Sequence, residues 1–212
     1  MQSLDRQRRF VAFAAAAIAG FVDATGFLAA DRYFVSFMSG NTTRLGADLV
    51  TSLGTAWFPT LLIAAFVGGV TGGALLAQAA RTWRKVAVLA LTSGLLVVAA
   101  SASALAWSIV VVMLLLAVAM GVLNNTFQRE GGVTVGLTYM TGALVRMGQG
   151  IAARIAGRGG EGWIVWLALW LALATGAISG AVTWRAIGMA GLWVPALAAA
   201  LLALFAARIR AL

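Results

Sequence analysis

The sequence predicts an all-α protein, a polytopic membrane helix bundle of six transmembrane helices with two broken or re-entrant polar segments and an inverted internal repeat. Three observations lead to this prediction. Hydrophobic residues make up 62% of the 212 residues and charged residues only 10%, whereas about 25% of a soluble domain is charged. The apolar residues form runs long enough to cross a bilayer, and a motif of the first half recurs in the second.

A transmembrane helix needs about 20 mostly apolar residues, because the hydrocarbon core is about 30 Å thick. Six runs meet this requirement, and they cover residues 10–30, 56–80, 86–101, 104–123, 163–184 and 189–207. The third and fourth come from one uncharged run, residues 86–123, which is too long for a single helix. Polar residues around Ser101 divide it.

Two further segments, residues 34–54 and 135–157, mix apolar residues with Ser, Thr, Gly and charges. Each could be a half-helix, a re-entrant segment or a polar crossing buried among other helices. If neither crosses and the N-terminus is cytoplasmic, the outer loops keep only Arg32, Arg44 and Arg185 of the 15 Lys and Arg residues. This distribution obeys the positive-inside rule. We therefore expect six crossings with both termini cytoplasmic, which also accounts for the net charge of +9.

An internal repeat divides the chain into residues 1–103 and 104–212. Met38 and Arg44, with a small residue and a glycine between them, recur as Met140 and Arg146 at an offset of 102. Further matches at nearby offsets pair Gly20, Asp23, Thr25, Gly68 and Gly72 with Gly121, Asn124, Thr126, Gly176 and Gly180. Three crossings in each half, an odd number, make the second copy enter the membrane from the opposite side, as in many transporters. If the polar segments also cross, the copies are parallel instead.

The amino-acid composition excludes several kinds of catalytic group and metal ligand. The chain has no Cys and no His, which removes disulfides, thiol nucleophiles, imidazole bases and the usual zinc and haem ligands. The positive charge does not lie on the polar face that a nucleic-acid-binding protein needs. We therefore expect no enzyme activity, no cofactor, no metal site and no nucleic-acid partner.

Asp23 is the most informative polar residue in the sequence, because it interrupts the first apolar run. A carboxylate in mid-membrane costs about 2.5 to 3.5 kcal/mol on insertion scales, so it indicates either a function or a buried partner. The alternative is that the apolar run ends earlier and Asp23 caps the helix near the interface. Its repeat mate, Asn124, cannot ionise, so only the first half offers a proton or cation site here.

The segment from Met38 to Arg44 is the second candidate. Glycine permits an unwound backbone, and a half-helix beginning near Ser39 would direct its N-terminal amides at a ligand. Arg44 and Arg146 would then reinforce an anion site, or they could instead extend to lipid phosphates while the glycines serve only close packing. The predicted substrate-binding residues are Asp23, Ser39, Gly40, Asn41, Thr42, Arg44, Asn124, Thr141, Gly142 and Arg146. We expect segments 38–46 and 140–148 to lie close together at the centre.

Two motifs resemble those of a known family. Gly20 to Phe27 reads GFVDATGF, and Ser36 to Asn41 reads SFMSGN. Both are similar to the motifs of the YoaK-like family of small integral membrane proteins, which is a domain of unknown function. The resemblance implies a bacterial inner-membrane protein and supplies no substrate.

The functional hypothesis that follows is a small secondary transporter of a small polar or anionic solute, with Asp23 as the group that couples transport to protons. A non-transporting membrane scaffold or accessory subunit and an uncoupled channel are the alternatives. The expected partners are the lipid bilayer, a small-molecule solute and a second copy of the chain, bound through G-x-x-x-G faces.

Overall fold

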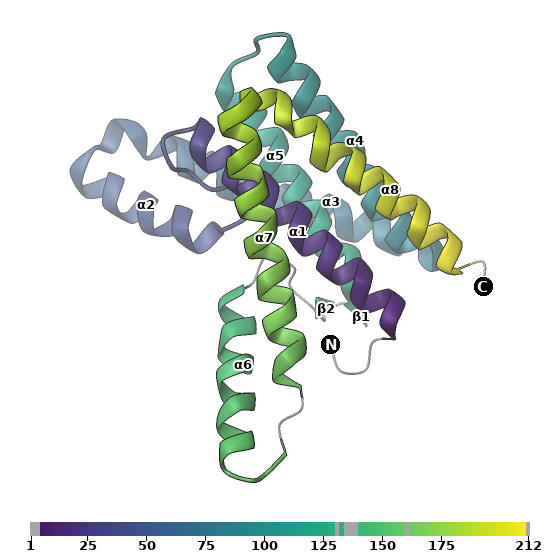
Figure 1. Ribbon diagram of the computed structural model, residues 1–212. Helices are drawn as coiled ribbons and strands as arrows, with labels where there is room; N and C mark the ends of the chain where they lie inside the picture. The colour runs from purple at the N-terminus through teal and green to yellow at the C-terminus, as the bar shows by residue number, and fades with distance from the viewer. Residues whose placement is uncertain (1–4, 130–131, 134–139, 160–161, 211–212) are drawn as a thin grey trace.

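The computed structural model describes residues 5–129, 132–133, 140–159 and 162–210. These residues form eight α-helices, which are α1 (Arg6–Ala29), α2 (Met38–Thr51), α3 (Trp57–Ala79), α4 (Arg84–Ala104), α5 (Ile109–Leu123), α6 (Met140–Ile155), α7 (Trp163–Ile187) and α8 (Trp193–Arg210) (Figure 1). Short 3-10 helices occur at η1 (Leu53–Thr55), η2 (Arg81–Trp83), η3 (Asn124–Phe127) and η4 (Gly188–Leu192). Two antiparallel strands of two residues each, β1 (Gln128–Arg129) and β2 (Gly132–Val133), follow η3 and are a small departure from the expected all-α structure.

The helices confirm a helical membrane protein. Within the described residues, five helical stretches are long and apolar enough to cross a bilayer, and these are Arg6–Ala29, Leu53–Ala79, Arg81–Ala104, Ile109–Phe127 and Trp163–Ile209. The last stretch is 47 residues long and contains α7 and all but the last residue of α8. Gly188, with a φ of 59°, breaks it in a left-handed conformation that glycine adopts without a steric penalty.

Some predicted bounds were wrong. The fourth helix begins at Ile109 and not at residue 104, because the chain must reverse between α4 and α5, where Ala106 has a φ of 56°. The polar segments 34–54 and 135–157 were expected to be broken or re-entrant. Their described residues contain one short helix each, α2 of 14 residues and α6 of 16, shorter than the about 20 residues that a full crossing needs. Residues 135–139 of the second segment lie outside the described residues.

The largest helix interfaces join the two halves of the chain. Helix α1 packs mainly on α7, which crosses it at the centre of the molecule, and α5 packs mainly on α3 (Figure 1). Helix α4 packs on α5 and α8, while α2 and α6 pack on α3 and α7 respectively. The principal partner of α1 is therefore in the second half, and that of α5 is in the first.

Glycines bring the backbones of α1 and α7 into direct contact. A Cβ atom on Gly20 would overlap the carbonyl oxygen of Leu173, and one on Gly176 would overlap that of Ala17. Small residues permit such close approach in membrane helices, where packing replaces the hydrophobic driving force. At Gly20 and Gly176 the two helices are so close that no side chain larger than the hydrogen atom of glycine fits between them.

The α3–α5 interface repeats this pattern. A Cβ on Gly121 would overlap the carbonyl oxygen of Phe66, and one on Gly69 would overlap that of Val118. Each of these four residues lies at the repeat position of its counterpart in the α1–α7 interface. The same backbone contacts thus occur twice in the chain.

The predicted glycine register in α3 was off by one residue. Nothing lies within 4 Å of a Cβ on Gly68 or Gly72. It is Gly69 and Gly73 that face α5, just as Gly176 and Gly180 face α1. The two overlapping G-x-x-x-G pairs of α3 cannot be separated by spacing alone, because they differ only in the face of the helix that they occupy.

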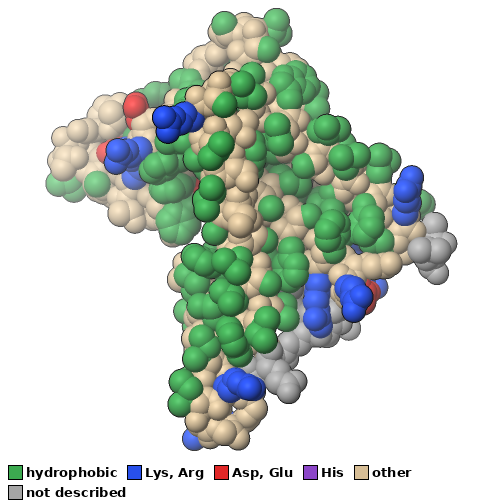
Figure 2. Space-filling view, viewed as in Figure 1, with side chains coloured by type: hydrophobic (Ala, Val, Ile, Leu, Met, Phe, Trp, Pro, Cys, Tyr) green, Lys and Arg blue, Asp and Glu red, His purple; other side chains and the backbone are tan. Residues whose placement is uncertain are grey.

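The outer faces of the helices are apolar. Large hydrophobic side chains that are exposed include Val67, Leu75, Ile178 and Leu197. Figure 2 shows such side chains spread over α4, α6, α7 and α8. In a soluble protein an apolar surface of this extent would cause association. Here it is the surface that contacts the lipid bilayer.

Candidate functional site

The loop after α1 turns back along that helix. Asp31 and Arg32 have φ values of 43° and 64°, so the chain reverses through the left-handed region, which non-glycine residues rarely occupy. The reversal brings the next residues alongside the last turns of α1. There Asp23 Oδ1 accepts hydrogen bonds of 2.9 Å from the backbone N–H groups of Val35 and Ser36.

These bonds give Asp23 a buried partner. Backbone N–H groups inside a membrane protein must find an acceptor within the protein, because lipid offers none. A carboxylate is the strongest acceptor among the side chains. Asp23 therefore binds the loop of residues 30–37, which leads from α1 into α2.

Asn41 fixes the same loop from its other side. It is fully buried, its Oδ1 accepts a 3.0 Å hydrogen bond from Phe34 N–H, and its Nδ2 donates one of 2.7 Å to Phe34 O. Gly40 leaves room for the aromatic rings, because a Cβ there would lie 2.5 Å from Phe37 Cδ1. Both residues hold the loop against the first turn of α2.

Arg44 lies over the ring of Tyr33, with the guanidinium carbon 4.1 Å from the ring centroid. One terminal nitrogen donates a 3.1 Å hydrogen bond to the carbonyl oxygen of Arg32. Its Nε is buried and has no hydrogen-bond partner in the described part of the chain. This buried N–H is an unsatisfied donor inside the cluster.

Tyr33 links this cluster to α2 and α3. Its hydroxyl donates a 3.1 Å hydrogen bond to Asp48 Oδ2, and its ring packs on Phe58 at 4.8 Å between centroids. Burial, and then the neighbouring Asp48 carboxylate, raise the pKa of the Tyr33 hydroxyl. Neither Tyr33 nor Asp48 was predicted from the sequence, because neither has a counterpart in the repeat.

In the second half, polar groups gather where α5 ends. Asn124 is buried and donates through Nδ2 to the carbonyl oxygen of Met120 at 2.9 Å. Asn125 is also buried and donates a 3.0 Å hydrogen bond to Val70 O of α3. Asn125 was not among the predicted residues, although an amide at the end of an apolar run was a usable signal. It joins α5 to α3 beside Gly73, where a Cβ would lie 2.6 Å from Asn125 Nδ2.

The remaining predicted residues lie at the surface of the two short helices. Ser39, Thr42, Thr141 and Arg146 are exposed, and Gly142 is half-buried. The Arg146 guanidinium lies over Trp166 of α7, 5.0 Å from the ring centroid. Among the described residues there is no group of three or more acidic, His or Cys side chains that could hold a metal ion.

Segments 38–46 and 140–148 do not meet at the centre, so that expectation was wrong. They belong to α2 and α6, which lie apart from each other, each against its own partner helix (Figure 1). The repeat places equivalent residues at two separate locations.

Comparison with known proteins agrees with this membrane architecture. The family model described as "Protein of unknown function (DUF1275)" matches residues 11–205. The UPF0700 transmembrane protein RA0705 of Rhizobium meliloti (strain 1021) is 39% identical to the chain over 185 residues, which are 87% of this chain and 80% of that protein. No solved structure matches the chain.

Proposed function

The chain belongs to the DUF1275 family of membrane proteins, and we propose that it is a small secondary transporter, which moves a small polar or anionic solute across the bacterial inner membrane. The proposal rests chiefly on one observation, the matched glycine contacts that join α1 to α7 and α5 to α3. Transporters are commonly built from two such related halves, with the solute site between them.

The halves are proposed to form an inverted repeat. We infer that the repeat mates α1 and α5 are antiparallel. This is supported by the contact between the end of α1 and the start of α5, where a Cβ added to Gly26 would lie 3.3 Å from Met113 Sδ. An inverted repeat relates its halves by an axis in the membrane plane, so one half can rock against the other and expose a central site to either side in turn.

Six helices are proposed to cross the membrane, namely α1, α3, α4, α5, α7 and α8, with both termini cytoplasmic. The distribution of basic residues supports this orientation. Arg8 of α1, Arg84 of α4 and Ile209 of α8 line one cavity. The beginning of α1, the α3–α4 connection and the end of α8 therefore lie at the same end of the bundle.

Asp23 is proposed to couple transport to protons. Its carboxylate holds the loop through bonds to Val35 and Ser36, and charge makes such bonds roughly twice as strong as neutral ones. Protonation removes that charge and weakens the attachment of the loop. Asn124 cannot undergo this change, so in our proposal only the first half responds to the proton gradient.

The test begins with a thermal-shift screen of purified protein against small anions, amino acids, sugars and nucleobases. A ligand at 100 times its dissociation constant stabilises a protein by about 2.7 kcal/mol. A hit is then tested for uptake in liposomes with an imposed pH step. We expect saturable, gradient-driven accumulation that Asp23→Asn abolishes and that Asp31→Asn, the matched control at an exposed carboxylate of the same loop, retains.

Two outcomes would contradict the proposal. Non-saturable flux that persists in Asp23→Asn would indicate an uncoupled channel. Absence of both ligand binding and flux would favour a scaffold or accessory subunit. One observation favours that second candidate, because Gly68 and Gly72 form an open G-x-x-x-G pair on the outer face of α3, the face through which a second copy could bind.

A further inference from the structure

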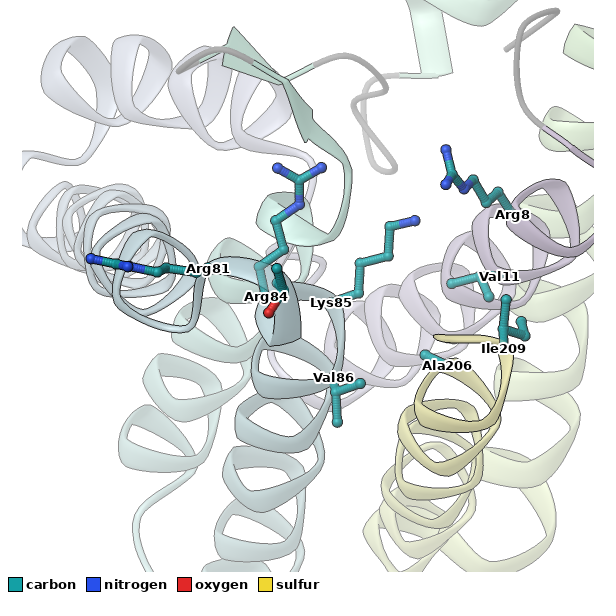
Figure 3. Close-up of a pocket in the computed structure, with 9 residues that line it drawn as sticks. Arg8, Val11, Arg81, Arg84, Lys85, Val86, Ala206 and Ile209 are labelled. Atoms are coloured by element: carbon teal, nitrogen blue, oxygen red, sulfur yellow. The ribbon is translucent and has the colours of Figure 1, made fainter. Parts of the chain in front are cut away.

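A cavity of about 590 Å³ lies at the end of the bundle where α1 begins, α4 begins and α8 ends. Its lining includes the cationic side chains of Arg8, Arg81, Arg84 and Lys85, and the apolar side chains of Val11, Val86, Ala206 and Ile209. Figure 3 shows Arg8, Arg84 and Lys85 extending into the same space, while Arg81 points away from it. Cationic groups from two helices thus converge above an apolar floor.

The positive charge of this cavity is only partly compensated. Arg8 Nε lies 3.2 Å from Asp5 Oδ2, an exposed pair that contributes little to stability. Among the residues that the structure describes, Arg84 and Lys85 form no ion pair, and Asp5, which is already paired with Arg8, acts on Lys85 only from a distance. Lys85 is half-buried, and its ammonium lies 5.3 Å from the ring centroid of Phe127.

We propose that this cavity binds an anionic phosphate group. Lysine and arginine are the side chains that proteins use to hold phosphate, arginine as a fork of donors and lysine as a point charge. An anion placed between Arg84 and Lys85 supplies the counter-charge that the described residues lack. The site is separate from the solute site proposed above and does not depend on it.

Two sources can supply such a group, namely the headgroup of an anionic phospholipid and free phosphate. Basic pockets between helices on the cytoplasmic side of a membrane are known to hold lipid headgroups. The apolar floor would contact the glycerol and acyl part of a lipid, and Trp83 next to the cavity is exposed, as is common for tryptophan at a membrane interface. Free phosphate would use the cations alone.

The experiment compares four probes on the full-length protein in neutral detergent. These are phosphatidylglycerol, phosphatidylcholine, inorganic phosphate and glycerol phosphate, with binding followed by native mass spectrometry and thermal shift. We expect phosphatidylglycerol to bind and phosphatidylcholine not to bind. Lys85→Gln and Arg84→Gln should each weaken binding about tenfold, the effect of losing one charge-assisted hydrogen bond.

Arg185→Gln is the matched control, because it removes the same charge from the last turn of α7, away from the cavity. The affinity of this variant for phosphatidylglycerol should stay within about a factor of two of the wild-type affinity. If inorganic phosphate or glycerol phosphate binds with the same dependence on Arg84 and Lys85, the phosphate site stands and its source is free phosphate. The proposal is overturned if no phosphate-bearing probe binds, or if the binding of every probe is unchanged in both Arg84→Gln and Lys85→Gln. Should Lys85→Gln fail to fold, the exposed Arg84→Gln decides the outcome.

Discussion

Asp23 Oδ1 accepts a 2.9 Å hydrogen bond from the backbone N–H of Val35, twelve residues further along the chain. This bond explains how an apolar helix tolerates a carboxylate. The cost of placing Asp23 in the membrane is offset by the backbone groups that it satisfies. The residue that the sequence marks as functional is therefore also a structural anchor.

Replacing Asp23 should separate these two roles. Asp23→Ala removes the acceptor and should lower the free energy of unfolding by about 3 kcal/mol, whereas Asp23→Asn keeps an acceptor oxygen and should lose about 1 kcal/mol. Unfolding by SDS titration in mixed micelles measures both. Equal and small losses in the two variants would show that the loop does not depend on this side chain.

Two adjacent glycines of α3 provide a matched pair of substitutions that test the α3–α5 packing. Gly69→Ala places a methyl group against the carbonyl of Val118 and should destabilise the protein by about 1 to 3 kcal/mol. Gly68→Ala enters open space and should stabilise it by up to about 1 kcal/mol through helix propensity. The same unfolding titration compares them, and a reversed order would contradict the α3–α5 packing.

Asn41 should matter more than its neighbour Thr42. Asn41→Ala leaves the N–H and C=O of Phe34 without their partner, at about 1 to 3 kcal/mol for each buried group. Thr42 is exposed, and among the described residues its hydroxyl bonds only the Met38 carbonyl of its own helix, so Thr42→Ala should change stability by less than about 0.5 kcal/mol. Thermal unfolding in detergent distinguishes the two, and similar melting temperatures would refute the role of Asn41.

Because the pKa of Tyr33 is raised in the folded protein, we expect the free energy of unfolding to decrease at high pH. The folded protein keeps the hydroxyl neutral, because burial and Asp48 raise its pKa, whereas the unfolded chain ionises Tyr33 near its ordinary pKa of about 10. The free energy of unfolding should therefore fall as pH rises above about 10. Melting temperatures between pH 8 and 11 should decline more steeply in the wild type than in Tyr33→Phe. Parallel declines would mean that other groups cause the effect.

Membrane topology can be tested directly, since the chain has no native cysteine. Thr82→Cys in η2 and Ser108→Cys between α4 and α5 are both exposed positions. An impermeant thiol reagent added to intact cells should label Ser108→Cys and leave Thr82→Cys unlabelled until the cells are opened. Labelling of Thr82→Cys from outside would contradict both the six-crossing topology and the inverted repeat.

Much of the fold followed from the sequence because membrane helices obey simple length and polarity rules. The six apolar runs, the two polar segments and the glycine-rich interfaces all have counterparts among the described helices. The sequence did not predict that Gly69, and not Gly68, faces α5, since the two G-x-x-x-G pairs that contain them have the same spacing.

The candidate site was harder to predict. Asp23 and Asn41 were recognised as unusual, but their partners are backbone groups of the loop at Phe34, Val35 and Ser36. A sequence does not show where a returning loop places its amides. The hydrogen bond between Tyr33 and Asp48 escaped for a related reason, because it depends on the left-handed turn before it.

Because α1 packs mainly on a helix of the second half of the chain, the order of synthesis affects how the interface forms. Helix α1 leaves the ribosome first, but α7, on which it packs most extensively, is completed only at Ile187. Until then the Ala- and Gly-rich face of α1 lacks its partner helix. A chain that ends before Ile187 does not complete the α1–α7 interface. Separately synthesised halves, conversely, carry complementary faces through which they can assemble in the bilayer.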